Sequence, residues 1–325
     1  MIPTGVSRYR LLQAHVPASL LQADTALIEA ARLEGRSPLL SDEFCVVDLE
    51  ICDGTVVAIA PAGQLVDAKP GQSESGNGSS SDSLMPAVDL RRKQVWPCFV
   101  DMHTHLDKGH IWERSPNPDC TFDSALEVVR KDSEHYWQAD DLYRRMSFGL
   151  KCSYAHGTRA IRTHIDAYGD QAGISLEVFR QLQQEWRDRL TLQAVCLVTV
   201  DYFCTPEGEA LADQMAEIEG GVLGGVAFPN ENIDAQLDRV FAIAQERQLS
   251  LDFHSDESGN PHDKTLRHIA RAAIRHQFDR PIVCGHCCSL AVQPPEEVQA
   301  TIDVVKEAGI GIVSLPLCNL YLQDR

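Results

Sequence analysis

From about residue 95 onward the sequence alternates between short apolar runs and longer amphipathic stretches, and this alternation constrains the fold more than any other feature. The stretches 233–247 and 264–276, for example, have apolar residues at three- and four-residue spacing, which is typical of helices. Strand–helix alternation indicates a parallel sheet, and this many units predicts an α/β protein with a (β/α)8 TIM-type barrel. The predicted strands are 96–102, 158–163, 190–198, 222–228, 249–253, 281–285 and 309–315.

The amino-terminal part of the sequence has a different pattern, which predicts a small separate domain. Residues 1–67 contain short apolar runs, and Asp53-Gly54 is a favoured two-residue turn between two of them. The stretch 71–83 has almost no apolar side chain, so it cannot repay the entropy of ordering. We therefore predict a partial β domain at 1–67, a flexible polar linker at 68–90 and the barrel at 91–325.

Length and composition bound the class of protein. The 325 residues suffice for one large barrel with a small accessory domain, and the net charge of −18 argues against nucleic acid as a partner, because phosphates are bound through Lys and Arg. The eleven cysteines are scattered, several in apolar runs, which is typical of reduced thiols. We find no secretory leader and no run as long as a membrane span, so we expect a cytoplasmic protein with no membrane contact.

Histidines stand at the ends of several predicted strands. His103 and His105 are two residues apart on the first strand, so both imidazoles point to the same side. His164, His254 and His286 end the second, fifth and sixth strands. Taken singly, each is more often a hydrogen-bonded structural residue than a ligand. Together they predict a shared site, because barrel enzymes keep their chemistry at the carboxyl ends of the strands.

The chemistry that such a group supports is metal-assisted hydrolysis. A divalent ion held by His103, His105 and His254 would leave a position for water and lower the pKa of that water towards neutrality. Glu257, three residues after His254, is placed to take the proton of the water and pass it to a leaving nitrogen. His286 is placed to stabilise developing charge or to polarise the water. We expect one ion, iron or zinc.

The sequence resembles the amidohydrolase superfamily, and within it the cytosine deaminase branch. The resemblance covers essentially everything from residue 95 to the end. The motifs that carry it are Phe99-Val-Asp-Met-His-Thr-His-Leu-Asp-Lys108, Arg162-Thr-His-Ile-Asp166, Val226-Ala-Phe-Pro-Asn230, Asp252-Phe-His-Ser-Asp-Glu257, Gly285-His286 and Pro316-Leu-Cys-Asn-Leu-Tyr-Leu-Gln323.

The resemblance implies roles for single residues. It implies His103, His105 and His254 as ligands of iron or zinc, Glu257 as the proton shuttle and His286 as the electrostatic partner of the attacking water. Family members hold the pyrimidine ring with a Gln after the fourth strand, a place that Asn230 takes here, one methylene shorter. Members with two metals carry a modified Lys there, and its absence favours a single ion. His164 and Asp166 would orient a ligand histidine by hydrogen bonding, although a core hydrogen-bond pair explains them equally.

The function predicted is hydrolytic deamination of a free, cytosine-type pyrimidine base. The resemblance also implies that the protein forms homo-oligomers. One alternative is another ring hydrolase of the superfamily, acting on an isocytosine, triazine or creatinine-like substrate. A second is a non-catalytic barrel, because the family places an Asp after an eighth strand and the sequence reaches Arg325 after the seventh. On that ground we expect a barrel incomplete at its carboxyl end, a fragment or a truncated product with weak metal binding.

Overall fold

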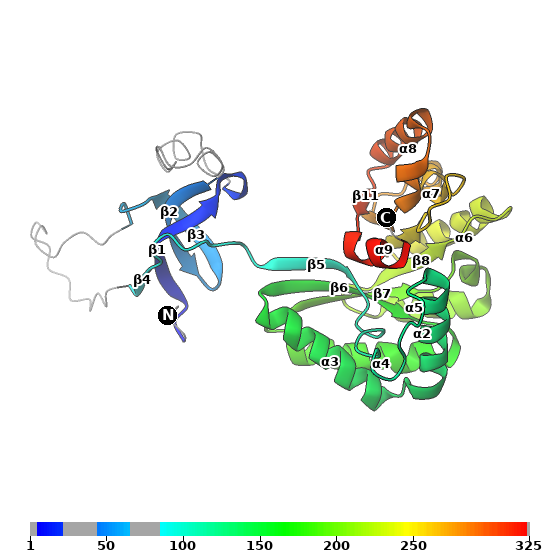
Figure 1. Cartoon of the computed structure of the whole chain (residues 1–325), viewed down its shortest axis with the longest axis horizontal. Helices are drawn as coiled ribbons and strands as arrows, with labels where there is room; N and C mark the ends of the chain where they lie inside the picture. The colour runs from blue at the N-terminus through cyan, green and yellow to red at the C-terminus, as the bar shows by residue number, and fades with distance from the viewer. Residues whose placement is uncertain (1–4, 22–43, 66–84, 324–325) are drawn as a thin grey trace, which may run out of the picture. The chain divides into compact units, whose positions relative to one another are not determined.

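The computed structural model of the chain describes residues 5–21, 44–65 and 85–323. The chain contacts divide it into two compact units, Met1–Pro97 and Cys98–Arg325 (Figure 1). The polar linker predicted at 68–90 lies mostly outside the described residues. The predicted barrel began at residue 91, whereas the structure places the chain up to Pro97 with the first unit.

The first unit is built on a four-stranded sheet with the order β3-β2-β1-β4. Its strands are β1 (Arg8–Pro17), β2 (Phe44–Cys52), β3 (Thr55–Pro61) and β4 (Ala87–Asp89), and the 3-10 turn η1 (Ala18–Leu20) follows β1. β2 is antiparallel to β1 and β3, and β4 is parallel to β1. The predicted turn joins β2 to β3, with positive φ at Asp53 (48°) and Gly54 (77°), as a tight hairpin of this kind requires.

The second unit contains seven parallel strands in the order β11-β10-β9-β8-β7-β6-β5, curled into a nearly closed barrel (Figure 1). The strands are β5 (Phe99–Thr104), β6 (Thr158–Asp166), β7 (Thr191–Leu197), β8 (Val222–Ala227), β9 (Ser250–Ser255), β10 (Ile282–His286) and β11 (Gly311–Val313). Each overlaps the strand predicted from the sequence, so the predicted fold class is confirmed. β5 and β11 are the edges of this sheet.

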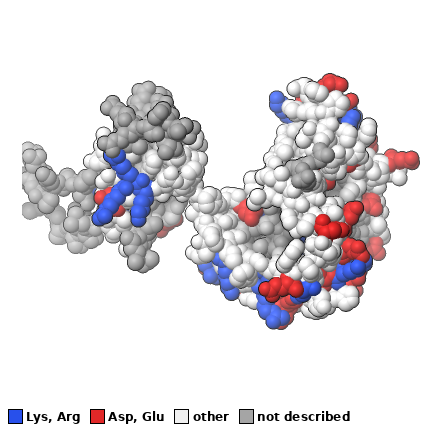
Figure 2. Space-filling view, in the orientation of Figure 1, with Lys and Arg blue, Asp and Glu red and all other residues white. Residues whose placement is uncertain are grey.

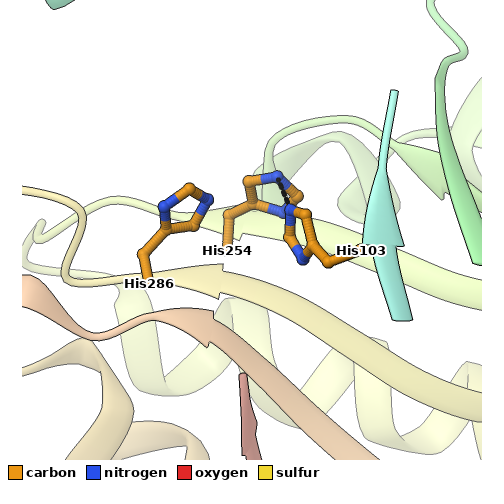
Figure 3. A group of neighbouring side chains, drawn as sticks. All are labelled: His103, His254 and His286. Atoms are coloured by element: carbon orange, nitrogen blue, oxygen red, sulfur yellow. Dashed lines mark hydrogen bonds between the residues drawn. The ribbon is translucent and has the colours of Figure 1, made fainter. Parts of the chain in front are cut away.

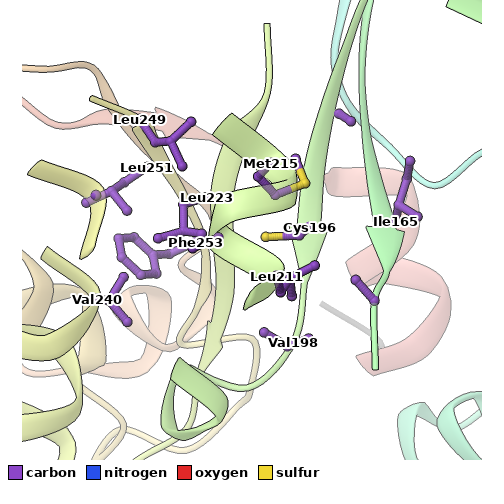
Figure 4. Close-up of a cluster of buried hydrophobic side chains, with 14 of the residues drawn as sticks. Ile165, Cys196, Val198, Leu211, Met215, Leu223, Val240, Leu249, Leu251 and Phe253 are labelled. Atoms are coloured by element: carbon purple, nitrogen blue, oxygen red, sulfur yellow. The ribbon is translucent and has the colours of Figure 1, made fainter. Parts of the chain in front are cut away.

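Helices lie between successive strands and pack on the outside of the barrel. They are α3 (Ala139–Ala155), α4 (Gly169–Trp186), α5 (Pro206–Ala216), α6 (Ile233–Glu246), α7 (Thr265–Arg275) and α8 (Pro295–Glu307), with the 3-10 turns η2 (Val200–Cys204) and η3 (Cys288–Val292). Figure 4 shows part of the core between sheet and helices, where Leu251 and Phe253 of β9 belong to the same buried cluster as Val240 of α6. Phe253 is fully buried, and truncating such a side chain to Ala typically costs about 3–5 kcal/mol.

Two helices fall outside the simple alternation. α2 (Phe122–Tyr136) precedes α3 in the connection from β5 to β6, and α9 (Pro316–Gln323) follows β11. Thr121 caps α2, because its side chain accepts a hydrogen bond from the backbone N–H of Ser124 at 3.3 Å. Both helices contribute residues to the cavity described below.

The structure shows where the charged side chains lie, the state of the cysteines and the character of the helices. On the face of the second unit seen in Figure 2, acidic side chains are spread along one flank and basic ones lie mostly along the lower edge. All eleven cysteines fall in the described residues, and none of them forms a disulfide there. None of the helices in the described ranges combines the length and the apolar character that spanning a membrane requires.

Candidate active site

The carboxyl ends of the barrel strands surround a cavity of about 310 Å³, which is large enough for a small molecule. Apolar side chains from α2, α9 and the ends of β7 and β8 form much of the wall. The α2 residues that face the cavity, at helical spacing on one side, are Phe122, Ala125, Leu126 and Val129. The carboxyl, amine and imidazole side chains of the wall are His105, Lys108, Asp166, His254, Glu257 and His286.

Three of the predicted histidines bring their Nε2 atoms together at this end of the barrel. Nε2 of His254 lies 3.2 Å from Nε2 of His103 and 3.3 Å from Nε2 of His105. Figure 3 shows the rings of His103 and His254 turned toward each other, with His286 beside them. Nitrogens bound tetrahedrally to zinc at 2.0–2.1 Å are about 3.3 Å apart, so each of these two spacings suits a pair of ligands on one ion. The groups whose ligand atoms all lie within 4.8 Å of one another are His103, His254 and His286, and His103, His105 and His164.

Hydrogen bonding alone does not account for this arrangement. A neutral imidazole Nε2 carries either one proton or one lone pair, so Nε2 of His254 cannot satisfy both neighbours. A cation accepts a lone pair from each of the three atoms. Burial lowers the pKa of His103 to about 2 and the pKa values of His105 and His254 well below their usual range, so the rings are neutral near pH 7, as ligands must be. The residues present therefore fit a divalent metal ion.

A buried charged pair supports the histidines. Asp252 of β9 is fully buried and accepts hydrogen bonds from Nη1 of Arg162 at 2.8 Å and from Nε2 of His164 at 3.1 Å. The ring of His164 packs against that of His103, with their centroids 4.0 Å apart. His164 therefore lies in contact with the histidine group, held there by Asp252.

Gly285 provides the space for the ring of His103. A Cβ at this position would lie 2.7 Å from Cε1 and 2.9 Å from Nδ1 of His103. The residue that follows, His286, has a φ of 69° and Cys287 has a φ of 55°. Two consecutive left-handed residues of this kind are uncommon and turn the chain sharply at the end of β10. The strand therefore both accommodates one histidine and orients another.

Glu257 and His286 form a second pair beside the histidine group. Nδ1 of His286 lies 3.1 Å from Oε1 of Glu257. Burial raises the pKa of Glu257 to about 7, against the opposing effect of Lys108, and burial lowers the pKa of His286 to about 4. A carboxyl group with a pKa near 7 can both accept and release a proton at neutral pH, which is what a proton shuttle requires.

Lys108 and Asp166 form an ion pair in the cavity wall, with 2.8 Å between Nζ and Oδ1. Burial would lower the pKa of Lys108, but the carboxylates of Asp166 and Asp107 outweigh it and raise that pKa. Asp107 is fully buried and accepts a hydrogen bond from the backbone N–H of Asp166 at 2.8 Å. The cation of Lys108 is therefore held in the wall by Asp166, the residue that the sequence suggested as a support for a ligand histidine.

Of the predicted site residues, His103, His164 and Asn230 are not among the described residues that line the cavity, and of these three Asn230 is the exposed one. Phe228 of the same loop stands in the wall instead. Nδ2 of Asn230 donates to the carbonyl of Phe228 and to Oε1 of Gln236, both at 3.0 Å, and its Oδ1 accepts from the N–H of Asn232. This amide is therefore occupied by the turn that begins α6.

Two parts of the site were not predicted from the sequence, the cavity-facing side of α2 and Asn319 of α9. Asn319 is buried, and its Nδ2 lies 3.2 Å from Nδ1 of His286. The signal for α2 was available, because apolar residues at 122, 125, 126 and 129 have helical spacing. Asn319 gave no such signal, because nothing in the order of residues shows which amide a turn will bring against a histidine.

Comparison with known proteins gives the family. No protein-family model matches the chain. A pterin deaminase of Rhizobium rhizogenes (strain K84) is 41% identical over 325 residues, which are 100% of this chain and 68% of that protein. An N-isopropylammelide isopropyl amidohydrolase of Pseudomonas sp. (strain ADP) is 24% identical over 238 residues, 70% of this chain and 58% of that protein.

A solved structure confirms the fold. The structure of the 5-methylcytosine deaminase of Klebsiella pneumoniae, with phosphonocytosine bound, superposes on this chain with a TM-score of 0.72 at 19% sequence identity. The match covers 97% of this chain and 68% of the deaminase chain. The motifs, the barrel and the identity to the Rhizobium protein agree. The chain is therefore a hydrolase of the amidohydrolase superfamily, as its motifs predicted.

Proposed function

We propose that this chain catalyses the hydrolytic deamination of a free amino-heterocycle, and that the substrate is a pterin or a similar bicyclic base. The observation that carries the proposal is the 41% identity to a pterin deaminase over all 325 residues. This replaces the cytosine-type base of the sequence analysis as the first candidate. A pyrimidine remains the second, because the fold is also that of a 5-methylcytosine deaminase.

We further propose that His103, His105 and His254 hold one divalent ion, iron or zinc. The support is their Nε2 spacing of 3.2 and 3.3 Å and the neutral state that burial imposes on the rings. When bound there, such an ion supplies Lewis-acid activation of water. Glu257 and His286, the pair beside the histidine group, are then available for proton transfer and for hydrogen bonding.

Glu257 and His286 take the proton-transfer roles in this proposal. Deamination forms a bond from the water oxygen to the ring carbon and breaks the bond from that carbon to the amino nitrogen. Glu257, with its pKa near 7, takes the proton from the water and delivers it to the leaving nitrogen, which departs as ammonia. His286 donates a hydrogen bond to the charge that develops around the attacked carbon.

The apolar wall of the cavity suits the faces of a flat ring. Phe122 and Leu126 of α2 lie in the wall together with Tyr168 and Phe228. The ion pair of Lys108 and Asp166 offers a donor and an acceptor to the polar edge of a ring. We propose these residues, rather than Asn230, as the groups that bind substrate.

The test is a substrate panel with ammonia release as the readout. We expect pterin to give the highest kcat/KM, above cytosine, 5-methylcytosine, guanine and N-isopropylammelide, and Glu257→Gln to abolish the release. Turnover of a pyrimidine with none of pterin would overturn the bicyclic assignment. A metal-loaded, folded protein that releases ammonia from no ring would instead support the non-catalytic alternative.

A further inference from the structure

Helix α9 turns one face to the cavity and the other to solvent. Cys318 and Leu322, one turn apart, line the cavity. Leu317 and Leu320 on the other side are 85% and 56% exposed. The inner face therefore belongs to the active-site wall, although the helix lies outside the regular strand–helix alternation.

Two amides on this inner face reach the proton-transfer pair. Asn319 is 5% exposed and its Nδ2 lies 3.2 Å from Nδ1 of His286. Gln323, four residues later, donates from Nε2 to the backbone carbonyl of Glu257 at 2.9 Å. α9 thus contacts both residues through side chains on one turn of helix.

The contact of Asn319 has a consequence for the protons of His286. An amide NH2 group can only donate, so Nδ1 of His286 must accept, and the single proton of the neutral ring then sits on Nε2. Nε2 has no hydrogen-bond partner among the described residues and lies on the side of the ring that faces His254 (Figure 3). The proton is thereby directed towards His254, on the side of the ring away from Asn319 and Glu257.

Glu257 alone would have the opposite effect. Its Oε1 lies 3.1 Å from the same Nδ1, and an ionised carboxylate accepts a hydrogen bond there, which moves the proton of the ring to Nδ1. With the proton on Nδ1, Nε2 has only a lone pair to offer. Asn319 opposes this by filling Nδ1 with a donor.

We propose that Asn319 is a positioning residue that sets the tautomer of His286 and keeps its proton on Nε2. The tautomer itself is independent of the substrate; only its effect on rate rests on the proposed deaminase function. The nearly isosteric variant Asn319→Asp replaces the donor with an acceptor and should favour the Nδ1–H form. Asn319→Ala removes the donor without adding a charge and should also populate that form.

The direct test is the imidazole ¹⁵N spectrum of the zinc-loaded full chain with labelled histidines. The His286 signals are assigned by their loss in His286→Gln. We expect a protonated Nε2 and an unprotonated Nδ1 in the unsubstituted chain, and the reverse in Asn319→Asp. A proton on Nδ1 of the unsubstituted chain overturns the proposal and needs no variant. An unchanged tautomer in both Asn319 variants overturns it as well.

The second readout is the split between kcat and KM. Asn319→Asp should lower kcat by about 10²-fold, the lower end of what losing one hydrogen-bond donor to a developing charge costs, with metal content unchanged and KM changed by less than about threefold. The control is Asn232→Asp, the same substitution at an exposed residue that begins α6. If the tautomer of His286 reverses in Asn319→Asp but no substrate is found, the inference stands and the proposed function fails. If Asn319→Asp lowers kcat and raises KM by equal factors, the positioning role of Asn319 is contradicted.

Discussion

Replacing Gly285 with alanine should weaken metal binding while leaving the barrel folded. The added Cβ would lie 2.7 Å from Cε1 and 2.9 Å from Nδ1 of His103. Carbon atoms in contact prefer about 3.5–4.0 Å, so roughly 1 Å of movement is needed. β10 is paired on both sides at this point, with Gly285 opposite His254 on β9 and Val313 on β11. The ring of His103, rather than the strand, must therefore move.

The size of the effect follows from that displacement. A 1 Å error in the position of a reacting or ligating group costs on the order of 10²-fold, and loss of a residue that orients a metal ligand typically costs about 10–100-fold in affinity. We therefore expect Gly285→Ala to bind zinc about 10–100-fold more weakly. Overpacking of this kind also lowers the free energy of unfolding by about 1–3 kcal/mol.

The assay is competition with a chromophoric chelator, combined with urea unfolding of the same samples. The control is Gly173→Ala in α4, where no atom lies within 4 Å of the added Cβ and alanine is the better helix former. Zinc affinity in Gly285→Ala within about twofold of the unsubstituted chain would show that the ring of His103 is free to move, and would refute the reasoning.

Other changes test the surroundings of the histidines. Asp252→Ala leaves the guanidinium of Arg162 without its buried partner and should lower the free energy of unfolding by about 3–5 kcal/mol, measured by urea titration, whereas Asp252→Asn should lower it by less. An unchanged urea midpoint for Asp252→Ala would contradict the role of Asp252 in supporting the histidines. Glu257→Gln should lower kcat by about 10²–10⁴-fold at unchanged metal content, and a loss below about threefold would remove Glu257 from proton transfer. In metal-free protein, the free energy of unfolding should fall by about 2 kcal/mol between pH 6 and pH 5. The reason is that unfolding lets four buried histidines take up protons, while two buried carboxyl groups release theirs and offset part of the effect. A free energy of unfolding that rises over this range would contradict the prediction. The pKa values of four histidines lie below their unfolded values because of burial; these are His103, His105, His254 and His286. Burial raises the pKa of the two carboxyl groups, Asp107 and Glu257, to about 7.

The barrel could be predicted because short stretches of sequence show which segments form its strands and helices. Each buried strand needs an apolar run and each outer helix an apolar face, so the order of elements and the seven strands followed from spacing alone. The edge of the first unit could not be predicted in this way. β4 has three residues and pairs with β1 across a long intervening segment, so no local pattern marks it.

The convergence of the histidines was predictable for a related reason. The carboxyl ends of parallel strands meet at one end of a barrel, so side chains at those ends become neighbours whatever their distance in sequence. The sequence alone did not show that the side chain of Asn230 would form hydrogen bonds within its own loop. An Asn whose side chain accepts from the N–H two residues later forms an Asx turn, and here that turn holds the amide away from the cavity.

Metal analysis of the purified chain shows whether His103, His105 and His254 together hold one metal ion. We expect one iron or zinc per chain, and a loss of bound metal of at least about tenfold in His254→Ala, with the circular dichroism of the fold retained. His156→Ala, at an exposed histidine after α3, should keep the full metal content. A chain that binds no metal, or a His254→Ala variant that retains it all, would contradict the claim.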